Sequence, residues 1–208
     1  GPVPLRLNIS TLYPCSNNSS TNCFPTNLLP PKTNTFIKNY TDYFSSNYDA
    51  VFGGFAYDTT KAFKTGVLRW KYGKKFEEVD AKKRNITPYG LIISANFLIR
   101  KEVFNEINHK LNRKSYGLDN YFAALLKQQK AKVLHINNET YHYGLEDNAA
   151  YVRKSEEAID TLLWMKDKKQ VTSHNNKLLK TYSSIKAIKL NYFMAFLYRF
   201  FNKSIREN

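Results

Sequence analysis

The sequence predicts an α/β protein, with a mixed sheet flanked by helices and a basic amphipathic helix at its C-terminal end. Short apolar runs bounded by glycine or polar residues are typical of buried strands. Segments with helical periodicity separate these runs, which indicates alternating strands and helices. The chain has 208 residues, of which 42% are hydrophobic, and this fits one domain with a core plus appendages.

Residues 1–31 differ in composition from the rest. They are rich in Ser, Thr, Asn and Pro, and the first acidic residue of the chain is Asp42. We expect this stretch to be irregular or disordered. Cys15 and Cys23 lie within it and match neither a secreted disulfide pattern nor a C-x-x-C pair.

Regular elements are expected from residue 32 onward. The expected helices cover residues 34–43, 74–83, 101–111, 119–130 and 148–166. The expected strands cover residues 49–57 with a glycine interruption, 89–100 with a break at 94–96, and a pair at 132–136 and 140–143 joined by a turn. The apolar residues expected to be buried on the last two helices are Phe122, Leu125, Leu126, Val152, Ile159, Leu162 and Leu163.

The segment Tyr116–Leu126 combines a glycine with an acid at the start of an amphipathic helix. The exposed N–H groups and the dipole at a helix start stabilise a carboxylate there. Asp119 can therefore be a simple N-cap. Facing a cleft, the same carboxylate can instead serve as a general base that takes a proton from an attacking hydroxyl.

Residues 117–122, which read GLDNYF, resemble the motif of the family 2 glycosyltransferases in which Gly and Glu-Asp precede an apolar helix. In that family the second acid deprotonates the acceptor hydroxyl, and Asp119 falls on it, while Leu118 replaces the usual Glu. Residues 94–104 are similar to the family's small-residue strand and the helix that follows it. Residues 133–146 are similar to its strand pair ending in His-x-Gly.

The resemblance covers residues 32 to about 182 and implies a partial A-type glycosyltransferase fold. Residues 32–168 would form the acceptor and catalytic half, and residues 169–208 a basic helical tail. The resemblance assigns catalysis to Asp119, a metal ligand to His142, and substrate contacts to Trp70, Asn96, Gly117, Leu118 and Asn120.

Several of these residues also have structural interpretations. Trp70 can anchor a loop on the core, and His142 can be a packed or surface histidine. Glu146 and Asp147 form a literal Glu-Asp pair and are second candidates for the base, although helix capping accounts for them better. His135 is interpreted as structural.

The family's nucleotide-binding half ends in an Asp-x-Asp motif that holds Mg²⁺ or Mn²⁺ against the diphosphate, and carboxylates suit that task. The corresponding place here, residues 24–28, reads FPTNL and contains no acid. We therefore expect this chain to lack the nucleotide-binding half and to have weak or absent activity alone. The expected function is sugar transfer from a nucleotide sugar to a glycan or lipid-linked acceptor in bacterial surface polysaccharide synthesis. The alternative is an inactive fragment or scaffold of the same fold.

The formal net charge is +15, and residues 166–208 contain ten cations but two acids. Aromatic and basic residues alternate over residues 178–201, which is typical of an interfacial membrane helix. The alternative is a helix that packs on the domain or on a second subunit. No nucleic-acid motif is present, so nucleic acid is not an expected partner. Without a run of ~20 apolar residues or a signal-peptide core, the sequence predicts a cytoplasmic protein, and the basic helix would allow it to lie on the inner face of the plasma membrane.

Overall fold

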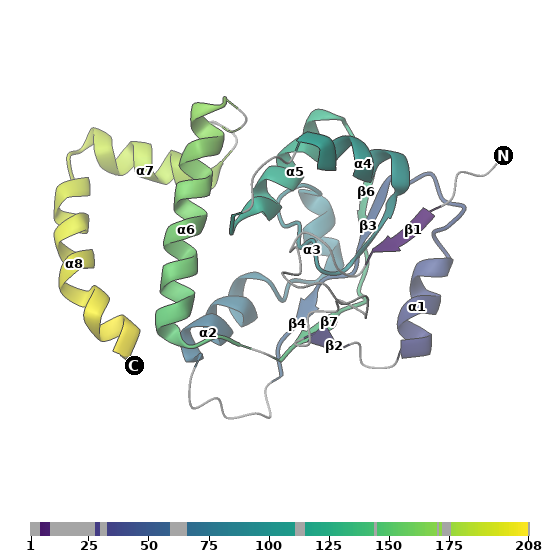
Figure 1. Cartoon of the computed structure of the whole chain (residues 1–208), viewed down its shortest axis with the longest axis horizontal. Helices are drawn as coiled ribbons and strands as arrows, with labels where there is room; N and C mark the ends of the chain where they lie inside the picture. Colours follow the sequence, from purple (N-terminus) through teal and green to yellow (C-terminus); the bar gives the residue numbers. More distant parts are fainter. Residues whose placement is uncertain are drawn as a thin grey trace, which may run out of the picture.

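The computed structural model describes residues 5–8, 28–29, 33–58, 66–110, 115–143, 145–169, 171 and 176–207. Its α/β architecture agrees with the predicted class (Figure 1). The helices are α1 (Thr33–Thr41), α2 (Val67–Phe76), α3 (Ala81–Ile86), α4 (Lys101–Lys110), α5 (Leu118–Gln128), α6 (Asn148–Asp167), α7 (Lys177–Ala187) and α8 (Asn191–Glu207). The strands are β1 (Leu5–Asn8), β2 (Leu28–Leu29), β3 (Ala50–Phe52), β4 (Phe55–Ala56), β5 (Phe97–Arg100), β6 (Val133–His135) and β7 (Thr140–His142).

The strands form two small mixed sheets. The larger sheet has the order β1-β5-β3-β6, in which β5 runs antiparallel to both neighbours and β3 runs parallel to β6. The smaller sheet has the order β2-β7-β4, in which β4 and β7 are parallel. The predicted pair at 132–136 and 140–143 therefore does not form a hairpin, because β6 and β7 belong to different sheets.

The glycine pair Gly53-Gly54 explains this division. Gly54 has φ +88°, a conformation that glycine adopts without a steric penalty. The backbone ladder continues across the bend, since Asn138 N–H donates to Gly53 O at 3.1 Å and Thr140 N–H donates to Gly54 O at 3.2 Å. Both parallel strands thus leave the first sheet together and continue in the second.

The core follows from the alternation of side chains along the central strands. Phe52, Phe97 and Ile99 point to one face and pack with Phe122 and Leu126 of α5. Val51 and Leu98, the alternate residues of β3 and β5, point to the opposite face of the sheet. There they form a second cluster with Phe36 and Tyr40 of α1. Helices thus cover both faces of the larger sheet, as the sequence predicted.

Two predicted elements in the middle of the chain differ in extent. Strand structure is confined to Phe97–Arg100 within residues 89–100, because the segment before it turns to hydrogen-bond other parts of the protein. The helix expected at 74–83 is replaced by the end of α2 and by α3, which Asp80 caps by accepting from Lys82 N–H at 2.8 Å.

Burial on α6 also differs from the prediction. Val152 and Leu162 are buried as expected, but Ile159 and Leu163 are 47% and 43% exposed. Neither side chain belongs to the core cluster that contains Leu162 and Met165 of the same helix.

Part of residues 1–31 is ordered as well. Leu5–Asn8 and Leu28–Leu29 form strands that pair with β5 and β7, so the expectation of irregular structure is corrected for those residues. The rest of that stretch, including Cys15 and Cys23, lies outside the described residues. The expected single helix at 178–201 is divided into α7 and α8 at Lys189, which has φ 58°.

Candidate functional site

Asp119 lies in the first turn of α5 but does not cap it. The N-cap is Gly117, with φ 84° and no side-chain hydrogen bond to the helix. The carboxylate of Asp119 accepts instead from the hydroxyl of Ser94, in the loop before β5. The N-cap interpretation of Asp119 is therefore wrong, and the acid joins two segments that are distant in sequence.

The loop that leads into α5 is fixed by α6. Tyr116 N–H donates to a carboxylate oxygen of Glu157 at 3.0 Å, and the hydroxyls of Ser115 and Thr161 lie 2.5 Å apart. A Cβ at position 117 would also meet Ala158. Gly117 is thus required by a left-handed backbone and by the close approach of α6.

The environment of Asp119 makes it a stronger base than an ordinary carboxylate. Burial raises its pKa to about 6, because a charged carboxylate loses water there. The charge of Glu77 acts in the same direction, while the hydrogen bonds from Ser94 oppose it. A pKa near 6 leaves the group ionised at neutral pH and able to accept a proton.

A buried ionic and aromatic cluster lies between α2, α6 and the smaller sheet. Arg69 pairs with Glu77 at 2.8 Å, and its guanidinium lies 5.5 Å from the ring centroid of Tyr57 and 5.6 Å from that of Tyr151. The hydroxyl of Tyr57 also donates to Glu77. One guanidinium nitrogen, Nη1 of Arg69, is buried without a hydrogen-bond partner in the part of the chain that the structure describes.

His142 belongs to the same cluster. Its ring stacks on Phe55 at 5.9 Å between centroids and meets the edge of Tyr57 at 5.7 Å. Burial, and to a smaller extent the positive charge of Arg69, lowers its pKa to about 4. Its Nδ1 atom is buried and has no partner among the described residues.

These neighbours do not fit the divalent cation that the resemblance implies at His142. Arg69 and Lys154 both place positive charge toward the ring, and the nearby acid Glu146 is paired with Lys154 at 2.6 Å. A hard divalent cation requires several oxygen ligands and is repelled by neighbouring cations. The described residues contain no group of three or more His, Cys, Asp or Glu side chains that could hold a metal ion.

Some of the residues to which the resemblance assigns substrate contacts are buried inside the protein, and others lie nearer the surface. Asn96 is fully buried, and its amide donates to the carbonyl oxygens of Gly54 and Asn138 at 2.8 Å each. Its Oδ1 accepts from the hydroxyl of Tyr40 at 2.7 Å. Leu118 is buried in the main core. Both therefore act inside the protein.

Trp70 and Asn120 lie nearer the surface. Trp70 is half-buried against the cluster of Phe55 and Tyr57, and its indole N–H donates to Asp58 O at 3.0 Å. This geometry is that of a loop anchor, the alternative considered for Trp70. Asn120 is exposed, beside Asp119 on the first turn of α5.

The second candidates for the base have structural roles. Asp147 is the N-cap of α6 and accepts from Ala150 N–H at 2.7 Å, so its capping interpretation is confirmed. Glu146 forms the ion pair with Lys154.

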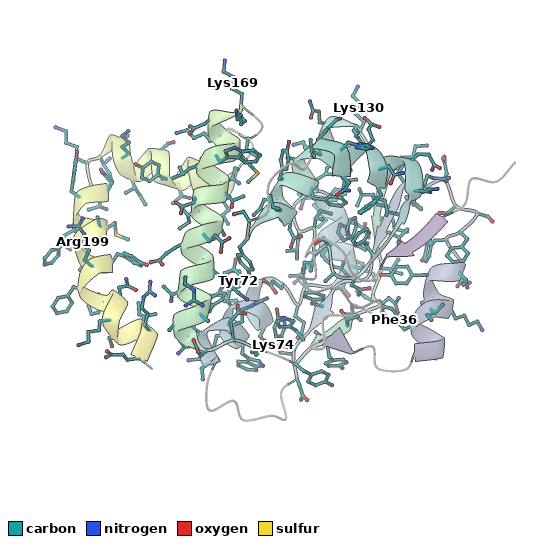
Figure 2. The ribbon with its side chains drawn as sticks, in the orientation of Figure 1. Phe36, Tyr72, Lys74, Lys130, Lys169 and Arg199 are labelled. Carbon is teal, nitrogen blue, oxygen red and sulfur yellow. The ribbon has the colours of Figure 1, made fainter. Side chains whose placement is uncertain are left out.

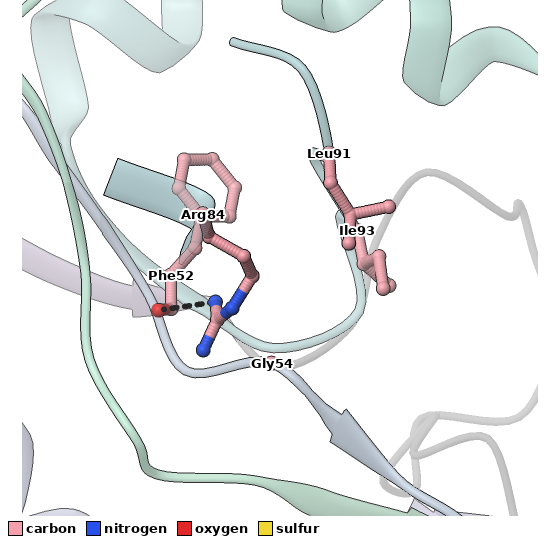
Figure 3. A pocket seen from close by; sticks show the side chains of 5 residues that line it. All are labelled: Phe52, Gly54, Arg84, Leu91 and Ile93. Carbon is pink, nitrogen blue, oxygen red and sulfur yellow. Dashed lines mark hydrogen bonds between the residues drawn. The ribbon is translucent and has the colours of Figure 1, made fainter. Parts of the chain in front are cut away.

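A small hollow behind Gly54 is lined by Phe52, Arg84, Leu91 and Ile93 (Figure 3). Arg84 holds the strands together there, donating to Phe52 O at 3.3 Å and to Ile136 O at 2.8 Å. It also contacts Nδ1 of His135 at 2.9 Å, which confirms a structural role for that histidine. The hollow is part of the core.

The sequence did not predict that Arg69, Glu77 and Tyr57 would form a buried cluster. Arg69 precedes Trp70 directly, and an arginine on a short helix carries no local sign that it will be buried. Comparisons of the chain with family models, with curated proteins and with solved structures find no match. The resemblance to family 2 glycosyltransferases therefore stays a prediction from the sequence.

Proposed function

We propose that this chain provides the acceptor side and the general base of a glycosyltransferase. The donor would be a nucleotide sugar, and the acceptor a hydroxyl group of a glycan or lipid-linked saccharide. The observation that carries the proposal is Asp119, a half-buried carboxylate with a pKa of about 6 at the start of α5. It is held by Ser94 and is not needed to cap its helix.

The chemistry assigned to Asp119 is one proton transfer. An acceptor hydroxyl within hydrogen-bonding reach gives its proton to the carboxylate while its oxygen bonds to the anomeric carbon. The bond from that carbon to the donor phosphate breaks, and its electron pair leaves with the nucleoside diphosphate. The hydroxyl of Ser94 donates to Oδ1 of Asp119 and thereby orients the carboxylate.

An aromatic side chain lies beside this base. Tyr116 is half-buried, and its pKa is raised to about 12, chiefly by burial and in part by the charges of Glu146, Glu77 and Asp119. The ammonium of Lys154 lies 5.5 Å from the centroid of the Tyr116 ring. A tyrosine face next to a carboxylate and an ammonium supports saccharide binding, because sugars present both apolar ring faces and hydroxyl groups.

The alternative is a saccharide-binding module that performs no transfer. The surroundings of His142 favour this alternative, because the positive charges of Arg69 and Lys154 repel a divalent cation there. Sugar transfer would need such a cation to neutralise the diphosphate leaving group. Under this alternative Asp119 would accept a hydrogen bond from the saccharide without removing its proton.

A turnover assay tests the proposal. The purified chain is incubated with UDP-, GDP- and dTDP-sugars and a set of alkyl glycosides, and release of the nucleoside diphosphate is measured. We expect weak turnover that Asp119→Asn reduces by roughly 10²–10⁴-fold, the usual contribution of a general base. Asp160→Asn, at an exposed acid on α6, is the matched control and should leave turnover unchanged.

Binding of the same glycosides, followed by saturation-transfer NMR, separates the two functions. Glycoside binding without turnover would favour the binding module. If the chain neither turns over a nucleotide sugar nor binds a glycoside, both are wrong.

A further inference from the structure

Helix α8 presents an aromatic face that the described part of the chain leaves exposed. Phe193, Phe196 and Phe200 are spaced three and four residues apart, which places them on one side of the helix. Their exposed fractions are 55%, 63% and 69%. None of the residues of α8 is buried, and the helix lies on the outer side of α6 (Figure 1).

The contact between α8 and α6 is polar and is centred on one acid. Glu156 of α6 accepts from the hydroxyl of Tyr198 at 2.5 Å and from the guanidinium of Arg206 at 2.8 and 2.9 Å. Tyr198 and Arg206 are eight residues apart and lie on the same side of α8, roughly opposite Phe193 and Phe200. Attachment through Glu156 therefore turns the aromatic face outward.

The helical pair that carries this aromatic face has an excess of cations. Helices α7 and α8 with their connection contain seven basic residues and one acid, Glu207. The basic residues are Lys177, Lys180, Lys186, Lys189, Arg199, Lys203 and Arg206. Arg206 is paired with Glu156, while Arg199 lies on the outer edge of α8, away from α6 (Figure 2). The connection between the helices exposes two further apolar side chains, Ile188 and Leu190.

The geometry points to α7 and α8 as an arm that binds the surface of an anionic lipid bilayer. The phenylalanines enter the boundary between headgroups and acyl chains, and the basic side chains contact lipid phosphates. Charge complementarity selects this occupant, because a patch with this excess of cations repels a second copy of itself. Among the described residues, none of the helices combines the length and the apolar composition of a membrane span.

Vesicle flotation of the full chain tests this inference. We expect flotation with phosphatidylcholine vesicles that contain phosphatidylglycerol, little flotation with phosphatidylcholine alone, and a loss of binding as NaCl is raised. The variant Phe193→Ser/Phe196→Ser/Phe200→Ser should weaken partitioning by at least roughly 100-fold, because three aromatic side chains no longer enter the bilayer. The variant Lys180→Gln/Lys186→Gln should weaken it by roughly 10–30-fold.

Control variants alter exposed apolar and basic side chains elsewhere. Ile37→Ser/Phe44→Ser/Ile86→Ser and Lys82→Gln/Lys83→Gln should leave flotation unchanged. All the substituted positions are exposed, so circular dichroism should show each variant to be folded. Absence of flotation with anionic vesicles, or flotation that survives the triple serine substitution, would overturn the inference. Capture of an oligonucleotide, or of a second copy through the same phenylalanines, in place of vesicles would overturn it as well.

Discussion

The hydroxyl of Ser94 donates to the carboxylate of Asp119, and this bond joins the loop before β5 to the first turn of α5. The two residues are 25 positions apart. An acid at this helical position would ordinarily interact with the N–H groups of its own helix. Here it is directed toward another segment and is partly desolvated, which gives it both a fixed orientation and a raised pKa.

The first prediction concerns the pH dependence of stability that Asp119 causes. Its folded-state pKa of about 6 exceeds the ordinary 3.8, so the protonated form stabilises the fold at low pH and this contribution is lost as pH rises through 6. Asp119→Asn removes the effect. The unfolding free energy of the variant minus that of wild type should therefore increase by roughly 2 kcal/mol from about pH 4 to about pH 7.5, allowing for solvent screening. Urea unfolding at both pH values measures this, and a constant difference would contradict it.

The ion pair of Arg69 and Glu77 should be strongly coupled. Arg69→Met leaves Glu77 with an unpaired charge in a buried site, and we expect a loss of about 3–5 kcal/mol. Arg69→Met/Glu77→Gln should recover part of that loss, which a double-mutant cycle detects. The exposed pair Lys110–Glu106 is the control, and Lys110→Met should cost less than about 1 kcal/mol. Equal losses at the two sites would show that Arg69 does not act through its charge.

His142 should stay neutral well below the pH at which an ordinary histidine titrates. Its pKa is lowered to about 4 by burial and by the charge of Arg69. NMR titration of the imidazole should therefore show no transition between pH 5 and pH 8, the range in which an unperturbed histidine changes charge. In Arg69→Met the pKa should rise, though not fully, because the ring remains buried. A normal titration in the wild-type protein would refute the buried cluster.

Gly73→Ala should destabilise the protein although alanine is the better helix former. Gly73 lies within α2, and a Cβ there would overlap the ring of Tyr57. The helix propensity favours alanine by about 1 kcal/mol, but the steric conflict should exceed that gain and give a net loss of about 1–3 kcal/mol. Lys71→Ala, at an exposed position of the same helix, should have little effect on urea unfolding. A stabilised Gly73→Ala protein would mean that Tyr57 moves aside easily.

Asn96→Ala should be among the most damaging polar substitutions. It removes the acceptor of the Tyr40 hydroxyl and the amide donor to Asn138 O in the interior, while Gly54 O keeps its bond from Thr140 N–H. Each unsatisfied buried group costs about 1–3 kcal/mol, so a total loss of about 3 kcal/mol or more is expected. Tyr40→Phe removes one of the three bonds and should cost less. Thermal unfolding of both variants tests this order, and the reverse order would assign Asn96 a role outside the core.

The sequence predicted the elements whose signal is local. Helix α5 was found because its apolar side chains recur with helical periodicity, and the structure buries Phe122, Leu125 and Leu126 as expected. The apolar run before β5 carried the same local signal as a strand, yet Ile93 packs with the cluster of Phe55 and Tyr57 and not in the larger sheet. Apolar composition shows that a segment is buried but does not show which neighbour it packs against.

What the sequence by itself determined is therefore the α/β class, the amphipathic helices and one acid at the start of a helix. The tertiary structure alone decided the partners of that acid and the composition of the buried cluster. Tyr57 follows β4, Arg69 lies on α2, and His142 lies on β7, so no spacing along the chain connects them. Their charges and rings interact because the bend at Gly53-Gly54 carries β4 and β7 together out of the larger sheet. Contacts between residues of different elements form only when the chain folds, and the periodicity within one segment contains no information about them.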